Sequence, residues 1–232
     1  MNNKKTVYTY NGKDITFYYD DEYFKVTTDN LSLVKFIRVL VKDKTLVEFG
    51  CGLGIIPLLM SDYNLKIVGI ECDKKAYSLA LNSIKENNLE EKITLINDYV
   101  QNVREYFEIN SVDIVVCNPP YFTLENESQV SSKNAKKIAR HDLSLTMEDV
   151  VSNANKILKN GGGLFLIQRV ERFFEIRDLL KQYGLAIKRV QFIYHDMEKP
   201  AKLFLLEARK NGKEQGLKVM APLMVGKEDC DG

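Results

Sequence analysis

One stretch, residues 45–71, constrains the fold of this chain more than any other. It reads in order as a buried strand, a glycine-rich turn, a helix and a second buried strand, at residues 45–49, 50–54, 55–60 and 66–70. The three glycines of the turn, Gly50, Gly52 and Gly54, let the backbone approach a ligand closely. The alternation predicts an α/β fold with a largely parallel sheet, in which ligands bind beyond the carboxyl ends of the strands.

Acidic residues follow the next two predicted strands. Glu71 directly follows the strand 66–70, and Asp98 comes just after the strand 93–96. A carboxylate at the Glu71 position of such a fold can bind both hydroxyls of a ribose. Because parallel strands end at one edge of the sheet, we expect both carboxylates to converge with the glycine turn on one nucleoside ligand.

The glycines alone do not identify that ligand. The fingerprint of nicotinamide enzymes needs a glycine or alanine at position 55, where Ile55 stands. Glu48, two residues before the first glycine, adds a third acid at the same edge. Cys51, Cys72 and Cys117 each lie at or just beyond a strand end. We therefore expect these thiols near the ligand pocket, as small packing residues and not as catalysts.

A fourth strand, residues 112–117, ends at Asn118-Pro119-Pro120-Tyr121. The two prolines end the strand directly after Asn118. No helix is expected to follow at this point, so the carbonyl groups of the turn are not used in helical hydrogen bonds. A substrate amino group there meets two acceptors, the Asn118 side-chain oxygen and the Pro119 carbonyl, while Tyr121 can stack on a flat ring. Such acceptors bend a conjugated nitrogen toward the geometry that attacks an electrophilic carbon, and they stabilise the developing charge. The simpler alternative is that the motif only ends a strand.

Composition limits the class of protein. The chain has 232 residues, of which 45% are hydrophobic, enough for one main domain with an ample core. A net charge of +1 confines any nucleic-acid binding to local patches. Four cysteines without C-x-x-C spacing and two histidines predict neither a metal site nor a disulfide framework. With no long apolar run, we expect a cytoplasmic protein with no membrane partner; the oligomeric state stays open, with a monomer favoured.

The rest of the chain fits one α/β domain with additions at its ends. Residues 1–42 predict an N-terminal extension, made of a hairpin around Asn11-Gly12 and a helix capped by Thr28 or Asp29. Residues 43–225 form the main domain, and residues 226–232 a flexible tail. Within the main domain, Thr146 and Asp149 resemble a capping box for a helix that runs to the glycines 161–163, with strands expected at 164–167, 187–194 and 203–207.

A long polar segment separates Tyr121 from Thr146. It carries a run of basic residues without an acid: Lys133, Lys136, Lys137 and Arg140. Beside an active site such a run could bind phosphates, and we identify these four as candidate RNA-binding residues. On charge alone, a solvated helical face explains the run equally well.

Taken together, the acid before the glycines, the acids at two further strand ends and Asn-Pro-Pro-Tyr after the fourth strand resemble the class I S-adenosylmethionine-dependent methyltransferases. The resemblance implies a Rossmann-like, seven-stranded and mostly parallel sheet, with helices on both faces and the last strand antiparallel. It also implies that S-adenosylmethionine is the cofactor and S-adenosylhomocysteine the product. Glu48 and the glycine turn would approach the methionine moiety, Glu71 the ribose and Asp98 the adenine amino group. The candidate cofactor-binding residues are Thr28, Asp29, Glu48, Gly50, Cys51, Gly52, Gly54, Glu71, Cys72, Asp98 and Asn118.

A narrower resemblance rests on four segments. It is to the bacterial tRNA adenine N6-methyltransferases that modify adenosine 37 of a valine tRNA, and the segments are Val26-Thr27-Thr28-Asp29, Asn118-Pro119-Pro120-Tyr121-Phe122, Ile138-Ala139-Arg140-His141-Asp142 and Leu145-Thr146-x-Glu148-Asp149. The family usually has glycine where Thr27 stands. The resemblance implies tRNA as partner, and Asn118, Pro119, Pro120 and Tyr121 as the residues that orient the reacting amine. No metal is implied.

Other functions remain open from these residues. Asn-Pro-Pro-Tyr also occurs in methyltransferases of release-factor glutamine amides, of guanine and of DNA adenine, so the motif identifies the type of nucleophile and not the molecule. A cofactor-sensing or RNA-binding module without turnover is the alternative from another class. Intact Glu71, Asp98 and Asn118 argue against it.

Overall fold

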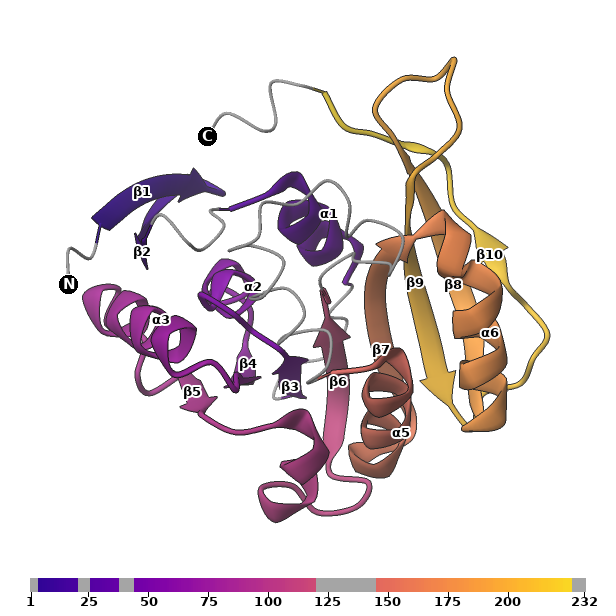
Figure 1. The fold of residues 1–232 in the computed structure, drawn as a ribbon, viewed down its shortest axis with the longest axis horizontal. Helices are drawn as coiled ribbons and strands as arrows, with labels where there is room; N and C mark the ends of the chain where they lie inside the picture. Colours follow the sequence, from indigo (N-terminus) through magenta and orange to yellow (C-terminus); the bar gives the residue numbers. More distant parts are fainter. Residues whose placement is uncertain (1–3, 21–25, 38–43, 120–144, 227–232) are drawn as a thin grey trace, which may run out of the picture.

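The computed structural model describes residues 4–20, 26–37, 44–119 and 145–226. A mixed β-sheet forms the middle layer and helices cover both of its faces (Figure 1). The strands of this sheet are β3 (Lys44–Phe49), β4 (Leu65–Ile70), β5 (Ile93–Ile96), β6 (Val112–Cys117), β7 (Leu158–Arg169), β8 (Leu185–Tyr194), β9 (Leu203–Lys210), β10 (Lys218–Val219) and β11 (Leu223–Met224). The helices are α1 (Thr28–Phe36), α2 (Ile55–Leu59), α3 (Lys74–Glu86), α5 (Met147–Ile157), α6 (Phe173–Gln182) and the 3-10 turns η1 (Val100–Glu105) and η3 (Val170–Arg172).

The order of the strands is that of a class I methyltransferase sheet. Its seven long strands lie in the order β8-β9-β7-β6-β3-β4-β5, with β9 antiparallel to both of its neighbours and the others parallel. The order of the strands reverses between β3 and β6, which pair in parallel although β4 and β5 lie between them in the sequence. Ligands of such sheets bind at this reversal, beyond the carboxyl ends of the strands. That end of the sheet is called the carboxyl edge below.

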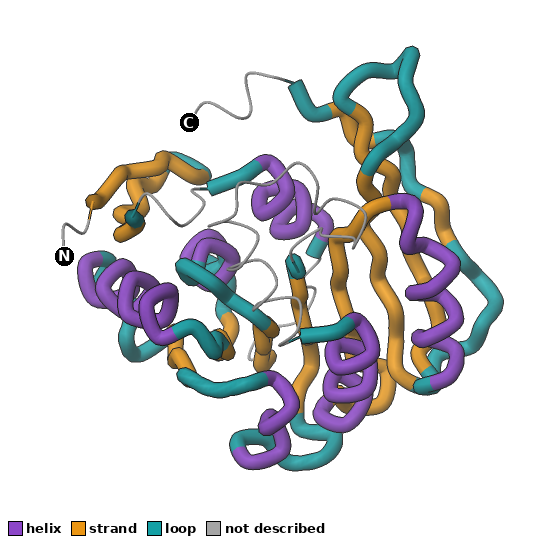
Figure 2. The backbone as a smooth tube through the Cα atoms, in the orientation of Figure 1, coloured by secondary structure: helices purple, strands orange, loops and turns teal. Residues whose placement is uncertain are grey.

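Two hydrophobic layers hold the helices on the sheet. One buries residues of α1, α2, α3 and the N-terminal hairpin, and the other buries residues of η1, α5 and α6 (Figure 2). The strands between them alternate accordingly: Val116 and Phe165 face the first layer, while Cys117 and Leu166 face the second. This alternation fixes which way each polar side chain points at the ends of the strands.

The hairpin forms a separate two-stranded sheet of β1 (Lys4–Tyr10) and β2 (Lys13–Tyr19). Asn11 and Gly12 make its two-residue loop with φ angles of 50° and 76°, the left-handed pair that a tight hairpin turn requires. The strand register closes directly on Asn11-Gly12, as expected for a hairpin around these two residues, because both adopt positive φ readily.

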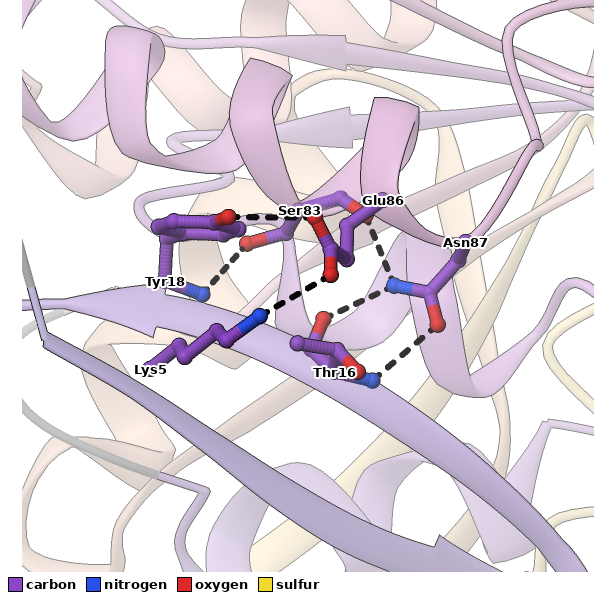
Figure 3. A network of polar contacts seen from close by, with 6 residues as sticks. All are labelled: Lys5, Thr16, Tyr18, Ser83, Glu86 and Asn87. Carbon is purple, nitrogen blue, oxygen red and sulfur yellow. Dashed lines mark hydrogen bonds and ion pairs between the residues drawn. The ribbon is translucent and has the colours of Figure 1, made fainter.

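The free side of β2 docks on α3 through polar contacts (Figure 3). The Asn87 amide, just past the end of α3, accepts from Thr16 N at 3.0 Å and donates to Thr16 O at 2.7 Å, as a neighbouring strand would. Tyr18 N donates to Ser83 Oγ at 2.8 Å, while Phe17 on the opposite side of β2 is buried in the core. The hairpin is thus attached to the part of the molecule that carries the glycine turn.

Several expected boundaries were wrong. Neither Thr28 nor Asp29 caps α1; Thr27 does, and its side chain accepts from Asn30 N in a capping box. The helix α5 ends at Ile157 instead of reaching the glycines, and β7 begins at once at Leu158. Glycines 161–163 lie inside this strand for two reasons. A Cβ on Gly162 would lie 2.9 Å from Lys159 O and one on Gly163 2.8 Å from Phe165, whereas Gly161 has open space around it and a left-handed φ of 75°.

The short edge strands β10 and β11 were not expected. They pair in parallel with β8 and bring the described sheet to nine strands. Two-residue strands carry too little periodicity to be found in a sequence. None of the described helices is long and apolar enough to cross a membrane.

Candidate active site

The glycine turn leads from β3 into α2 with three left-handed residues. Gly50, Gly52 and Gly54 have φ angles of 68°, 53° and 72°, a region that side chains disfavour. A Cβ on Gly54 would lie 3.3 Å from Ala80 Cβ of α3, so this glycine allows the close packing of turn and helix. A Cβ on Gly52 would meet no atom within 4 Å. The backbone at Gly52 therefore borders open space into which a ligand can approach.

Glu71 holds the turn in place. This carboxylate is only 4% exposed, yet each oxygen accepts a backbone N–H at 2.8 Å: Oε2 from Gly52 and Oε1 from Asp73. Asn97 Nδ2, from the end of β5, donates to the Glu71 carbonyl at 2.7 Å. The residue expected to bind a ribose thus also ties together the loops after β3 and β4.

Unlike Glu71, Glu48 is a buried carboxyl group whose hydrogen bonding is incomplete among the described residues. It is 3% exposed, and its Oε2 has no hydrogen-bond partner in the part of the chain that the structure describes. Burial, with a smaller contribution from the negative charge of Glu71, raises the pKa of Glu48 well above its ordinary value. Val116 and Gly69 flank it in the sheet register. A buried acceptor of this kind is suited to a cationic ligand group, which would supply both the missing partner and the missing charge.

Asp98 is held as an ionised acceptor after β5. Tyr106 Oη donates to Oδ2 at 2.7 Å, while Asn102 Nδ2 and Tyr99 N donate to Oδ1 at 2.9 and 2.7 Å. These hydrogen bonds, that of Tyr106 first, lower the pKa of Asp98. An ionised carboxylate that keeps an open lone pair can accept from an amino group of a ligand.

The cysteines at this edge are poor nucleophiles. Burial raises the pKa of both Cys51 and Cys117, and the nearby Glu48 raises them further. Cys51 fits because β4 has no side chain at Gly69, where a Cβ would lie 2.7 Å from the Cys51 sulfur. Cys72 is half-buried. The small-residue packing expected for Cys51 and Cys117 agrees with this arrangement.

The first turn of α1 contains Thr28 and Asp29, and Thr28 is buried. The Thr28 hydroxyl donates to the Asp29 carboxylate at 3.5 Å, and α1 packs against α2, the helix that the glycine turn opens. Both residues are therefore attached to the element that follows the turn.

At the end of β6, Asn118 is half-buried and Pro119 is buried. The strand pairs with β3 on one side and β7 on the other, so these residues leave the sheet directly beside the glycine turn. Pro120, Tyr121, Lys133, Lys136, Lys137 and Arg140 lie outside the described residues. Their expected roles therefore stay predictions.

Sequence reasoning missed one polar residue at this edge, Gln168. It ends the apolar run of β7 and is fully buried, with a side-chain nitrogen that finds no acceptor among the described residues. A single amide at the end of an otherwise apolar strand was the available signal. Across the described residues, no group of three His, Cys, Asp or Glu side chains is placed to bind a metal ion.

The comparisons with solved structures agree with this architecture. A predicted O-methyltransferase from Agrobacterium tumefaciens superposes with a TM-score of 0.66 at 18% identity, over 86% of this chain and 89% of that one. A 16S rRNA N2 guanosine methyltransferase from T. thermophilus, in complex with AdoMet and guanosine, gives 0.62 at 21% identity over 90% of this chain and 50% of that one. The fold is that of the class I S-adenosylmethionine-dependent methyltransferases.

The family follows from the sequence comparison. The model of the family described as "Methyltransferase small domain" matches residues 30–193, and the chain belongs to that family. Among curated relatives, the tRNA1(Val) (adenine(37)-N6)-methyltransferase of Cytophaga hutchinsonii is 24% identical over 202 residues, 86% of this chain and 82% of the relative. That of Pseudoalteromonas translucida is 29% identical over 165 residues, 70% of this chain and 68% of the relative.

The residues present fit the cofactor of this class. The open space over Gly52 allows a ligand to contact the backbone, and the unpartnered Glu48 oxygen suits the ammonium group of the methionine moiety. Glu48 lies in β3 two residues before the turn, and Gly52 lies in the turn itself, whose backbone Glu71 already fixes.

Proposed function

We propose that this enzyme transfers the methyl group of S-adenosylmethionine to the N6 amino group of an adenosine in tRNA, with adenosine 37 of valine tRNA as the target. The observation that carries the proposal is the position of Asn118 and Pro119, which leave β6 beside the glycine turn. The names of the relatives support adenosine and tRNA over other amino-bearing substrates.

Asn118 and Pro119 supply the chemistry on the substrate side. The Asn118 side-chain oxygen and the Pro119 carbonyl accept the two hydrogens of the amino group and turn its lone pair away from the ring. Positive charge then grows on the nitrogen as it attacks, and both acceptors stabilise that charge. No covalent enzyme intermediate is needed, because catalysis consists of positioning and of this electrostatic support.

The cofactor side has a different task. Bound S-adenosylmethionine supplies a methyl group on a sulfonium, which is already a good leaving group. Glu48 offers its buried oxygen to the methionine ammonium, Glu71 its carboxylate to the ribose and Asp98 an acceptor to the adenine amino group. Because Glu71 also holds Gly52 N at 2.8 Å, the turn that faces the cofactor is fixed before binding.

The proposed RNA contacts lie in the basic run of Lys133, Lys136, Lys137 and Arg140. Other arginines after β7 are already paired with acids: Arg172 contacts Glu175 at 2.7 Å, and Arg169 contacts Glu171 at 3.3 Å. Exposed ion pairs of this kind leave little net positive charge for phosphates. The basic run, which contains no acid, is therefore the better candidate.

The test is methyl transfer from labelled S-adenosylmethionine to total tRNA from a strain that lacks this gene, followed by nucleoside analysis. N6-methyladenosine is the expected product. Two valine tRNA transcripts that differ only at position 37, with adenosine or cytidine there, provide the matched control. Only the adenosine transcript should take up label.

Label in a release-factor protein instead of tRNA would refute the tRNA assignment and keep the Asn118 chemistry. Label in guanosine of rRNA would likewise refute the tRNA assignment and keep the Asn118 chemistry. Absence of any transfer, with cofactor binding intact, would favour a binding module without turnover.

A further inference from the structure

We propose that Gln168 is a specificity-determining residue, whose side-chain Nε2 donates a hydrogen bond to the ring nitrogen next to the amino group that is methylated. This inference rests on the proposed function for the identity of the base. The contact would add a third point of recognition to the two acceptors of Asn118 and Pro119.

The first support is the state of the Gln168 side chain. It is fully buried, and Nε2 has no hydrogen-bond partner among residues 4–20, 26–37, 44–119 and 145–226. A buried N–H without an acceptor costs free energy, so native proteins rarely keep one without a reason. A ligand that brings an acceptor removes that cost.

The orientation of the amide is fixed by its other end. Gln168 Oε1 accepts from the backbone N–H of Arg169 at 2.8 Å. Rotating the amide by half a turn would place Nε2 against that N–H, two donors facing each other, and would lose this bond. The free end of the side chain is therefore a donor.

The second support is the place of Gln168 in the sheet. The paired register of β6 and β7 ends at Cys117 and Leu166, and Pro119 and Gln168 each come two residues later on neighbouring strands. On its other side Gln168 pairs with Phe204 of β9, a fully buried ring that offers no acceptor. The substrate side, next to Pro119, is where an acceptor can arrive.

The chemistry of the substrate supplies that acceptor. In adenine the N6 amino group is attached to C6 and is flanked by two ring nitrogens. N1 is bonded to C6 itself and N7 to the neighbouring C5, and both accept hydrogen bonds. When Asn118 and Pro119 hold the amino hydrogens, one of these nitrogens faces a neighbouring donor. A base that placed an N–H there would leave two donors facing each other.

The contact should affect binding more than the chemical step. A donor on the ring nitrogen draws electrons from the conjugated amino group, so it does not help that group attack. Its hydrogen bond is present in the ground state and is no stronger in the transition state. Loss of the contact should therefore raise KM for RNA and leave kcat nearly unchanged.

The experiment compares Gln168→Met, which keeps the length and removes both the Nε2 donor and the Oε1 acceptor of the Arg169 N–H, with Gln191→Met, which removes a side-chain amide at the surface. Gln191 lies on β8, which β9 separates from β7, and its side chain donates to Ala221 O at the surface. Substrates are valine tRNA anticodon stem-loops that carry adenosine, 1-deazaadenosine or 7-deazaadenosine at the target position. The readouts are KM, kcat, the Kd for S-adenosylhomocysteine and the midpoint of thermal unfolding.

With the unchanged enzyme, we expect one of the two deaza substrates to raise KM by roughly 3- to 10-fold, as for the loss of one hydrogen bond. Gln168→Met should raise KM for the adenosine substrate by a similar factor and no longer distinguish that deaza analogue from adenosine. Gln191→Met should behave as the unchanged enzyme. The sensitive analogue identifies N1 or N7 as the acceptor.

A Gln168→Met enzyme that discriminates the analogues as well as the unchanged protein does would overturn the inference. So would a variant whose unfolding midpoint and cofactor Kd change while KM for RNA does not, because that result describes a structural role. Failure of the unchanged enzyme to methylate any adenosine RNA would overturn the proposed function, and with it the adenine contact assigned to Gln168.

Discussion

The two halves of the carboxyl edge differ in how their polar groups are satisfied. At the ends of β3, β4 and β5, which we propose as the cofactor half, the carboxylates of Glu71 and Asp98 are held by backbone or side-chain donors of the protein itself. At the ends of β6 and β7, which we propose as the substrate half, Gln168 keeps a buried donor that the described residues do not satisfy. The fold thus satisfies these two carboxylates of the first half by itself, and it leaves one buried donor of the second half without an acceptor among the described residues.

Within the proposed cofactor half, Glu48 differs from Glu71 and Asp98 because one of its oxygens has no partner among the described residues. It belongs to the cofactor half, and its unpartnered oxygen lies beside the turn that Glu71 holds rigid. A rigid frame with one open acceptor favours a ligand of constant structure, such as a cofactor. Substrate recognition tolerates a less complete frame, because the substrate brings many contacts of its own. The predictions below test this division of labour.

The largest effect is expected for Asn118→Ala. Loss of one acceptor in the transition state should lower kcat by on the order of 10² or more, with cofactor affinity within a few-fold. Asn97→Ala is the control from the other half: it removes the 2.7 Å bond to the Glu71 carbonyl and should weaken cofactor binding with little effect on kcat. Single-turnover methyl transfer and calorimetric titration separate the two quantities. If both variants changed the same quantity, the edge would not divide into two halves.

Gly52→Ala should affect the cofactor half alone. The added methyl group occupies the open space over the turn, and the left-handed φ of 53° adds strain of about 1–2 kcal/mol. Gly12→Ala at the hairpin loop is matched: its φ is 76° and its Cβ also meets nothing within 4 Å. Both variants should lose similar stability on denaturation. Only Gly52→Ala should weaken cofactor binding, by about tenfold or more; equal cofactor affinities would place the ligand elsewhere.

Glu48→Gln should stabilise the protein and weaken its binding. The pKa of Glu48 is raised in the folded state, so the folded protein holds a proton that the unfolded chain releases. Stability conferred by the protonated form is therefore lost as pH rises from about 4.3, the ordinary pKa of glutamate, through the raised value. The variant avoids this loss, and its free energy of unfolding should exceed that of the unchanged protein by about 1–3 kcal/mol near neutral pH.

Cofactor binding adds a second readout for Glu48. A cationic ligand displaces the proton, so the affinity of the unchanged protein should increase with pH across the same window. Glu48→Gln should bind roughly 3- to 10-fold more weakly and without that pH dependence. Isothermal titration at several pH values measures both. A variant that binds as tightly as the unchanged protein would remove Glu48 from the cofactor site.

The sequence predicted the cofactor half better than the substrate half, and the reason is physical. Glycine spacing and acids at strand ends are local signals, because positive φ angles and strand ends are properties of a few adjacent residues. They placed the glycine turn, Glu71 and Asp98 after β3, β4 and β5, as the structure has them, while the binding roles of these residues stay predictions. The Thr146–Asp149 capping box was predicted for the same reason: both of its hydrogen bonds span three residues.

Features that depend on distant pairing were not predicted. The orphan donor of Gln168 arises from the register between β6, β7 and β9, which no local pattern encodes. The bond from Gly52 N to Glu71 likewise depends on how the loops after β3 and β4 meet. The glycines at 161–163 predicted a helix end, but close packing in the sheet explains Gly162 and Gly163, and a positive φ explains Gly161.

The smallest effect is expected where the N-terminal hairpin docks on α3. Asn87→Ala removes the two bonds to Thr16 that dock the hairpin on α3, and should lower the free energy of unfolding by about 1–2 kcal/mol. Phe17 of the hairpin, together with Leu53 and Ile55 around the glycine turn, lines a small apolar pocket. Cofactor Kd should thus rise a few-fold, while KM for RNA stays constant. Lys5→Ala, which breaks only an exposed ion pair with Glu86, is the control and should change neither quantity. If Asn87→Ala altered KM for RNA instead, the hairpin would belong to the substrate half.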